Sequence, residues 1–145
     1  MTAHPLAAVF PLLTARQLEQ LSALAESATI RKGSVLVREG QHADTLYLIR
    51  DGVANLIKNL AEAEIVVAEI PAGELIGEMS FAGNFPATAT VTAATDITAL
   101  KIDKARLTAL LEGDAALGMA VFRSIASTLS RRLLQITERF AFLRV

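Results

Sequence analysis

IGEMSFAGNFPATATVTA, residues 76–93, carries the strongest structural signal in this chain. Ile76 ends an apolar strand, and Gly77 precedes a short segment of helical composition that opens on an acidic residue, Glu78. A Gly/Asn/Pro loop comes next, and a Thr/Val strand resumes at Thr88. The unpaired N–H groups at the start of such a helix point into the loop, where they suit an anion such as a phosphate. The segment therefore predicts an anion cradle between two strands.

Short strands dominate the sequence on both sides of this segment. Glycine turns separate them, and Asp51-Gly52 gives the strongest hairpin signal because it favours positive φ at both central residues. Many short strands spaced about ten residues apart indicate an antiparallel sandwich or barrel. The expected strands include Ile30 and cover residues 34–38, 45–50, 53–58, 65–70, 88–93 and 97–103.

Helices are expected on both sides of the strands. Thr14 and Gln17 have the spacing of a capping box, and the apolar residues that follow have helical spacing, so a helix is predicted over 14–28. Asp103 is suited to cap a short helix over 104–111.

A long helix is predicted at the C-terminal end, over 114–142, because this stretch has no proline and one internal glycine. We therefore expect a single domain over 1–145 that is mainly β with flanking helices. Its centre is an antiparallel, jelly-roll-like β-roll over 30–103, with the cradle at 76–91 inside it.

The composition excludes several classes of function. Hydrophobic residues make up 52% of the 145 residues and aromatic residues 5%, so the core is mainly aliphatic. The net charge of −1 gives no basic surface for nucleic acid. The chain has no cysteine, which excludes disulfides, thiolate zinc sites and cysteine nucleophiles and fits a reducing compartment.

No segment has the pattern of an export signal or a membrane span. Residues 1–13 are apolar but lack the basic start of a signal peptide and contain two prolines. The longest uncharged run, 79–95, is rich in threonine and broken by glycine and proline. We expect a cytoplasmic protein without membrane contact.

Catalysis has little support in the sequence. The histidines are His4 and His42, and neither belongs to a Ser/His/Asp or metal-ligand motif. Glu39, His42 and Asp44 cluster in a turn whose composition is that of a solvated loop. No glycine loop of the Walker or dinucleotide type occurs. We expect no enzyme activity, no metal and no cofactor.

Two stretches resemble the cyclic-nucleotide-binding domain family. KGSVLVREGQHADTLYLIRDGVANLIK, residues 32–58, has the family's order of glycine turns and apolar strands. IGEMSFAGNFPATATVTA is similar to the family's phosphate-binding cassette, without a gap. The resemblance extends over about residues 10–142 and includes sensor domains of the catabolite-activator type. It implies a β-roll that binds a small anionic ligand, with cyclic AMP and cyclic GMP as candidates.

The resemblance also implies roles for the cassette residues. The family glycine that matches Gly77 lets the backbone approach the sugar-phosphate. The family glutamate that matches Glu78 accepts a hydrogen bond from the ribose 2′-hydroxyl. Such a contact contributes about 1.5–3 kcal/mol. Alternatively, Glu78 is a favourable charge in the first helical turn. The implied ligand-binding residues are Gly77, Glu78, Met79, Ser80, Ala87, Thr88 and Thr137.

Ser80 and Thr88 belong to the phosphate side of this set. Ser80 and the backbone around it line the phosphate position in the family. The Thr88 hydroxyl is placed to donate to a phosphate oxygen, or the residue is a strand threonine chosen for β-propensity.

Ala87 departs from the family pattern, which has an arginine here to pair with the phosphate. Losing such a charge-assisted hydrogen bond costs about 1.5–3 kcal/mol, or about ten- to 150-fold in affinity. Compensation by Arg38, Arg50 or Lys58 is open from the sequence. Weak or altered ligand binding is therefore expected.

The long helix has an apolar seam with steps of three and four residues. A seam of this period favours a homodimer through paired helices, although part of it must cover the β-roll. The seam residues are Phe122, Ile125, Leu129, Leu133, Ile136 and Phe140.

The end of the helix also resembles the dimer helix of catabolite-activator regulators, where a hydroxyl residue reads the base of the ligand. Thr137 lies near that position. Those regulators continue into a helix-turn-helix that enters the DNA major groove. This sequence ends at Val145, about where that part starts, so no nucleic-acid contact is expected of this chain alone.

The leading hypothesis is a non-enzymatic sensor domain for signal transduction, dimeric through its last helix, with weak or altered ligand binding. One alternative is a ligand-free dimerisation or protein-interaction module. Another is the sensor half of a catabolite-activator-type transcription regulator without its helix-turn-helix.

Overall fold

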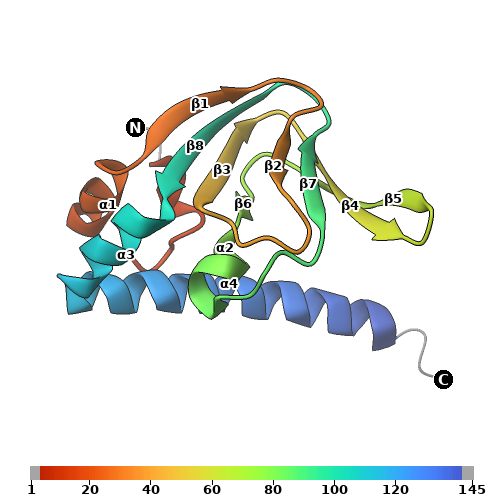
Figure 1. The fold of residues 1–145 in the computed structure, drawn as a ribbon. Coiled ribbons are helices and arrows are strands. Elements are labelled where there is room, and N and C mark those ends of the chain that lie inside the picture. Colours follow the sequence, from red (N-terminus) through yellow and green to blue (C-terminus); the bar gives the residue numbers. More distant parts are fainter. Residues whose placement is uncertain (1–3, 142–145) are drawn as a thin grey trace.

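Two four-stranded antiparallel sheets form a roll, and helices gather along one side of it (Figure 1). The computed structural model describes residues 4–141, so the predicted helix end at Phe142 lies outside the described residues. The predicted β-roll with flanking helices is confirmed. The elements are η1 (Pro5–Ala7), α1 (Ala15–Ser22), β1 (Glu26–Ile30), β2 (Val35–Val37), β3 (Thr45–Asp51), β4 (Ala54–Leu60), β5 (Ala63–Ile70), β6 (Leu75–Ile76), α2 (Glu78–Gly83), β7 (Thr90–Ala93), β8 (Ile97–Asp103), α3 (Lys104–Glu112) and α4 (Ala115–Ala141).

The predicted hairpin at Asp51-Gly52 is wrong. One sheet has the strand order β1-β8-β3-β6 and the other β2-β7-β4-β5, so β3 and β4 lie in different sheets. Gly52 does have a positive φ of 99°, but it turns the chain from one sheet to the other. A dipeptide sets the shape of a turn, whereas burial of both neighbouring strands sets their partners. The hairpin that forms joins β4 to β5, with Leu60 opposite Ala63.

The predicted N-terminal helix over 14–28 is too long. Its capping box is present, because Thr14 Oγ1 accepts from Gln17 N at 3.2 Å and Gln17 Oε1 accepts from Thr14 N at 2.9 Å. The helix ends at Ser22, and β1 begins at Glu26, so the roll starts before residue 30. Pairing of β1 with residues 97–101 of β8 overrides the helical spacing.

The other observed element boundaries differ from the predicted ones by one or two residues. The helix predicted over 104–111 continues to Glu112, and the long helix begins at Ala115. The strand expected from Thr88 begins at Thr90. These are the shifts expected at element ends, where local patterns are weakest.

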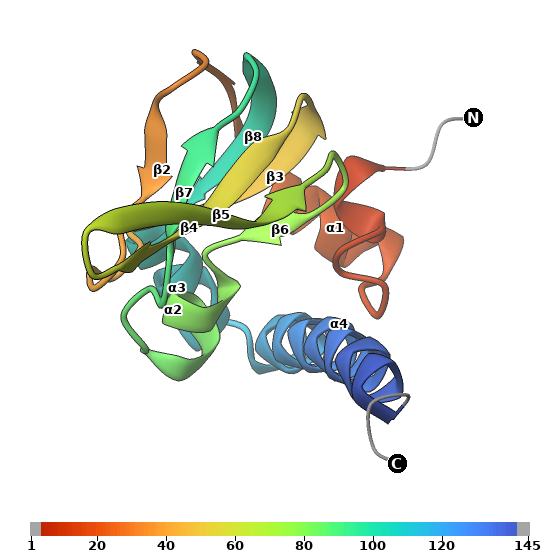
Figure 2. The ribbon, with the colours of Figure 1, turned by 90° about the vertical axis from the view of Figure 1, so that its right-hand side faces the viewer.

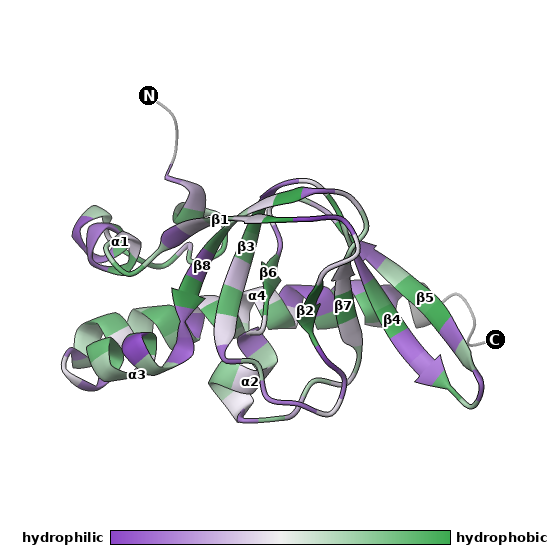
Figure 3. Cartoon of the chain, turned by 45° about the horizontal axis from the view of Figure 1, so that its top comes forward, coloured by the Kyte–Doolittle hydropathy of each residue, from purple (hydrophilic) through white to green (hydrophobic). Residues whose placement is uncertain are grey.

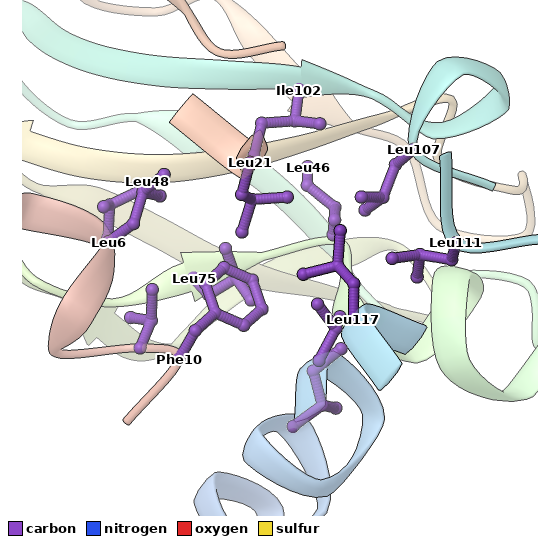
Figure 4. Packing of buried hydrophobic residues seen from close by; sticks show 13 residues of the cluster. Leu6, Phe10, Leu21, Leu46, Leu48, Leu75, Ile102, Leu107, Leu111 and Leu117 are labelled. Atoms are coloured by element: carbon purple, nitrogen blue, oxygen red, sulfur yellow. The ribbon is translucent and has the colours of Figure 1, made fainter. Parts of the chain in front are cut away.

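The core consists of two layers that share the sheet containing β3. Leu46 and Leu48 on one face of β3 pack against the helices, whereas Ile49 on the other face packs against the second sheet. This alternation follows from the two-residue period of a strand. Figure 4 shows the helix-side layer, which is built from η1, α1, β3, β6, β8, α3 and α4. Its labelled residues are Leu6, Phe10, Leu21, Leu46, Leu48, Leu75, Ile102, Leu107, Leu111 and Leu117.

The β4–β5 hairpin extends beyond the roll, in the same general direction as the C-terminal half of α4 in Figure 1. Figure 2 shows that hairpin and helix leave the roll at different sides. β5 is exposed along nearly its whole length, although Ile65, Val66 and Val67 are apolar. Much of β5 has the green colour of hydrophobic residues in Figure 3. The roll therefore ends in an arm and a helix that flank the cassette.

Candidate ligand-binding cavity

A cavity of about 560 Å³ lies between the cassette, the β4–β5 hairpin and the C-terminal half of α4. This volume is within the range of about 300–1,000 Å³ that is usual for small-molecule sites. Its wall residues come from β2, β4, β5, β6, α2, β7 and α4 and from the loops beside them. Helix α4 is thus one wall of the cavity and not only a cover for the core.

Six of the seven residues predicted from the sequence line this cavity. Thr137 does not line it: the residue is exposed, and its hydroxyl donates to Leu133 O on the same helix at 2.9 Å. Gln135 and Ile136 line the cavity in its place. The predicted residues that the fold brings together there are Gly77, Glu78, Met79, Ser80, Ala87 and Thr88.

Gly77 has a structural requirement of its own. Its φ is +98°, a conformation that L side chains rarely adopt. A Cβ atom here would lie 2.8 Å from the Thr45 carbonyl oxygen on β3. Glycine is needed at this position for the turn into α2 and for its packing against β3, whatever the cavity contains.

Arg132 on α4 reaches into the cavity and contacts two carboxylates. Its Nη1 donates to Glu78 Oε1 at 2.7 Å, and its Nη2 donates to Glu74 Oε2. The Arg132 side chain is 35% exposed and that of Glu78 only 11%. The residue expected to accept a ribose hydroxyl therefore already has a cationic partner from the last helix.

The charge state of Arg132 follows from these contacts. Burial lowers the pKa of Arg132, but the carboxylates of Glu78 and Glu74 outweigh burial and raise the pKa above its ordinary value. The guanidinium stays charged throughout the physiological pH range. Its two-carboxylate contact therefore persists wherever the glutamates are ionised.

Sequence reasoning missed Arg132 and proposed other cations near Ala87. Arg38, Arg50 and Lys58 do not line the cavity. The Lys58 amine instead donates to Thr88 O at 2.6 Å and lies 3.5 Å from Glu39 Oε1. A usable signal was the position of Arg132 between Leu129 and Ile136, at three- and four-residue steps on one face of the helix.

The residues around the expected phosphate position are already engaged. The Ser80 hydroxyl accepts from Ala43 N at 3.2 Å and donates to Phe85 O at 2.8 Å. Ala87 N donates to Gln41 O at 2.9 Å. Ala87 presents a half-buried methyl group next to the inter-sheet core. The hydroxyl of Thr88 lies on an exposed residue.

Helix α2 is joined to α4 at a second point. The rings of Phe81 and Phe122 stack with centroids 5.4 Å apart and an interplanar angle of 7°. Glu78 and Phe81 are one turn apart on α2, so this short helix contacts α4 through side chains of its first turn. The position of α4 is therefore linked directly to the cassette.

The predicted seam of α4 is divided between two surroundings. Ile125 is buried in the core and Leu129 packs against it, whereas Leu133 and Ile136 are exposed. The side chain of Phe140 lies outside the described residues. The part of the seam that was expected to cover the β-roll is therefore its first half.

The described residues contain no helix that is long and apolar enough to cross a membrane. Within the same range, 4–141, no group of three or more His, Cys, Asp or Glu residues is placed to hold a metal ion.

The geometry of this β-roll and cassette defines a ligand-binding regulatory fold. The cyclic nucleotide-binding domain family matches residues 28–114, and the chain belongs to that family. No curated protein matches the chain by sequence at a significant level.

Solved structures agree with this assignment. The N-terminal domain of a transcriptional regulator from Streptomyces coelicolor is 28% identical, with a TM-score of 0.75; the match covers 90% of this chain and 95% of that one. The regulatory domain of Toxoplasma gondii PKA, crystallised with cAMP, is 25% identical with a TM-score of 0.67, covering 72% of this chain and 41% of that one. The Catabolite Activator Protein of Thermus thermophilus has the same fold, with a TM-score of 0.75 at 23% identity, over 94% of this chain and 63% of that one.

Proposed function

We propose that this chain is a non-enzymatic sensor domain in which a small molecule in the cavity changes how α4 packs on the β-roll. The contact between Arg132 and Glu78 carries the proposal, because it connects the cavity wall to the last helix. A ligand that enters beside Glu78 has to share or replace this contact. Ligand occupancy and helix position are then linked by one coupling free energy.

Cyclic nucleotides are expected to bind weakly. Family membership and the cAMP-bound relative from Toxoplasma gondii make cAMP and cGMP the nucleotides to test first. Ala87 provides no cation for their phosphate, and Glu78 is already paired with Arg132. Because the missing charge-assisted hydrogen bond costs about ten- to 150-fold, a micromolar site becomes near-millimolar.

Two measurements test this function. Calorimetric titration with cAMP and cGMP should give weak binding, and absence of heat and thermal shift at millimolar nucleotide excludes both as ligands. Hydrogen exchange tests the coupling: Glu78→Gln should speed exchange of α4 amides beyond Leu129 by about three- to tenfold, or about 0.6–1.4 kcal/mol. Glu112→Gln, the same change at an exposed end of α3, is the control. Equal exchange in both variants would rule out the coupling.

The outer face of α4 supports a homodimer as part of this proposal. Its apolar residues follow steps of three, four, three, four and three, the period of a coiled-coil seam. Compared with the sequence prediction, Ala126 replaces the buried Ile125 in the seam. The exposed residues of this face are Met119, Phe122, Ala126, Leu133 and Ile136, and Leu129 between them is half-buried against the core.

Oligomeric state tests the dimer. Light scattering at high micromolar concentration should give twice the chain mass, and Leu133→Glu should give the monomer because it places a charge in the seam. Ser130→Glu, an exposed position on the same helix, should leave the dimer intact. A monomeric wild-type protein would contradict the proposal. A dimer that binds no ligand would favour an interaction module instead.

A second candidate function is the sensor part of a transcription regulator. The observation that favours it is the similarity to the Streptomyces coelicolor regulator domain over 95% of that chain. Sequencing the reading frame beyond Val145, or the intact mass of the protein from its native source, tests this directly. We place the protein in the cytoplasm, which is consistent with its lack of cysteine.

A further inference from the structure

The lining of the cavity is mostly aliphatic. Val37, Leu56, Ile76 and Val91 come from the β-roll, and further alanine, isoleucine and methionine side chains complete the walls. Favourable transfer of apolar surface from water, about 25 cal/mol per Å², is therefore the main driving force available to a ligand here.

The charges that the lining contains are predominantly negative. Glu69, Glu74 and Glu78 contribute three carboxylates, and Arg132 contributes one cation, so the described lining residues sum to −2. An anion that enters this cavity loses part of its hydration and finds more carboxylates than cations in the lining, with the buried Glu78 among them. The lining opposes a phosphate, a sulfonate or a carboxylate.

The place of a cation is occupied as well. Arg132 bridges Glu74 and Glu78, and it belongs to the same chain as both. A cationic ligand has to compete with this intramolecular partner, whose effective concentration is high. Arg132 therefore disfavours a cationic ligand at the position between Glu74 and Glu78, where the two carboxylates would attract it most.

We infer that the ligand of this cavity is an uncharged, largely apolar small molecule with one polar end, and not a nucleotide phosphate. Its apolar body lies against the aliphatic walls, and its polar end meets the Glu78–Arg132 pair, which presents both an acceptor and a donor. This inference rests on the proposed sensor function, because it names the ligand class of the same cavity.

A matched pair of fluorescent probes tests the inference. N-phenyl-1-naphthylamine is uncharged and carries one N–H group, whereas 8-anilino-1-naphthalenesulfonate has the same aromatic body with one sulfonate added. The uncharged probe should bind at micromolar concentration, and the sulfonate should weaken binding by about tenfold or more. Equal or tighter binding of the sulfonate probe in the cavity would overturn the inference, as would failure of the uncharged probe to bind.

Two variants establish that the probe is in the cavity. Ala68 lines the cavity on the exposed strand β5, where a larger side chain is tolerated by the fold. Ala68→Phe should reduce binding of the uncharged probe about tenfold. Val67→Phe changes the neighbouring residue on the opposite face of the same strand and should leave binding unchanged. Equal effects of the two variants would show that the probe binds the surface and would overturn the inference.

Reversal of the charge preference gives an independent check. Ala87→Arg should improve binding of the sulfonate probe relative to the uncharged one by about tenfold. Ala109→Arg, on the exposed side of α3, is the control for the added charge and should leave the ratio unchanged.

The outcomes separate this inference from the proposed function. If only cAMP or the sulfonate probe occupies the cavity and α4 exchange responds, the sensor function stands and the uncharged ligand class is wrong. If the uncharged probe occupies the cavity and α4 exchange does not respond to it or to Glu78→Gln, the ligand class stands and sensing is wrong.

Discussion

Two parts of the cavity wall differ in charge although the same cassette contributes to both. The acidic part consists of Glu74 and Glu78 with Arg132 between them, and α4 completes it. The Ala87 part consists of Ser80, Ala87 and Thr88, and its polar groups are committed to the fold or exposed. Glu74, Glu78 and Arg132 therefore place charge beside the last helix, whereas the Ala87 part contributes none.

The two parts therefore offer different chemistry to a molecule in the cavity. In the acidic part, the guanidinium of Arg132 faces two carboxylates of the protein, whereas the Ala87 part has no cationic side chain. In the proposed sensor, ligand choice depends on these side chains, and the coupling to α4 depends on the position of Arg132 on that helix.

Restoring a cation in the Ala87 part should have the largest effect. Ala87→Arg is expected to tighten cAMP binding by about ten- to 150-fold, because it adds the missing charge-assisted hydrogen bond. Calorimetry measures the change, with Ala109→Arg as the variant that adds the same charge elsewhere. An affinity unchanged by Ala87→Arg would mean that the Ala87 part does not receive the phosphate.

Removing the cation from the acidic part should have the next largest effect. Arg132→Met leaves the buried Glu78 without its partner, which costs about 1–2 kcal/mol after allowing for the partial exposure of the pair. The midpoint of thermal unfolding should fall by about 3–8 °C.

Two further variants make this prediction specific. Arg131→Met changes the exposed neighbouring arginine and should shift the midpoint by less than about 2 °C. Adding Glu78→Gln to Arg132→Met should recover part of the loss, since the unpaired charge is removed. A loss that is the same for Arg131 and Arg132 would argue against the ion pair.

The aromatic contact between α2 and α4 should matter somewhat less. Phe81→Leu removes the stack on Phe122 and should cost about 0.5–1.5 kcal/mol in urea unfolding. Phe85→Leu, at a 59% exposed position of the following loop, is the comparison and should cost less than about 0.5 kcal/mol. A larger loss for Phe85 would mean that the loop, and not the stack, holds α2.

The smallest effect is expected at Thr88. Its side chain is exposed, so Thr88→Val should change cAMP affinity by less than about threefold. Calorimetry on the Ala87→Arg background, where binding is strong enough to measure well, decides this point. A loss of tenfold there would assign the hydroxyl to the phosphate.

Local sequence patterns were sufficient for the type of most elements. Alternating apolar residues and glycine turns predict the strands, and the capping box at Thr14 predicts a helix start. They were not sufficient for pairing, because the partner of β3 is chosen by burial on both faces over long distances in the chain. The helix that was predicted to continue through Ala28 failed for the same reason, since β8 lies far away in sequence.

The candidate site likewise contains residues that a local sequence pattern identifies and one residue that it does not. The cassette residues are contiguous in the sequence, so a resemblance over one segment identified them together. Arg132 is 54 residues from Glu78, and nothing in its local sequence names its partner. Only the docking of α4 on the roll brings the two side chains together.

The β4–β5 arm, which extends beyond the roll, makes the protein convenient for spectroscopy. Its tip at Ala61-Glu62 is exposed, Thr137 is exposed on α4, and the sequence has no cysteine of its own. Glu62→Cys and Thr137→Cys together introduce two thiols per chain for spin or fluorescent labels, and in the Leu133→Glu monomer each label pair lies within one chain. The distance between the two labels reports on the angle between the β4–β5 arm and α4. The same measurement therefore detects whether a molecule in the space between them moves the arm or the helix.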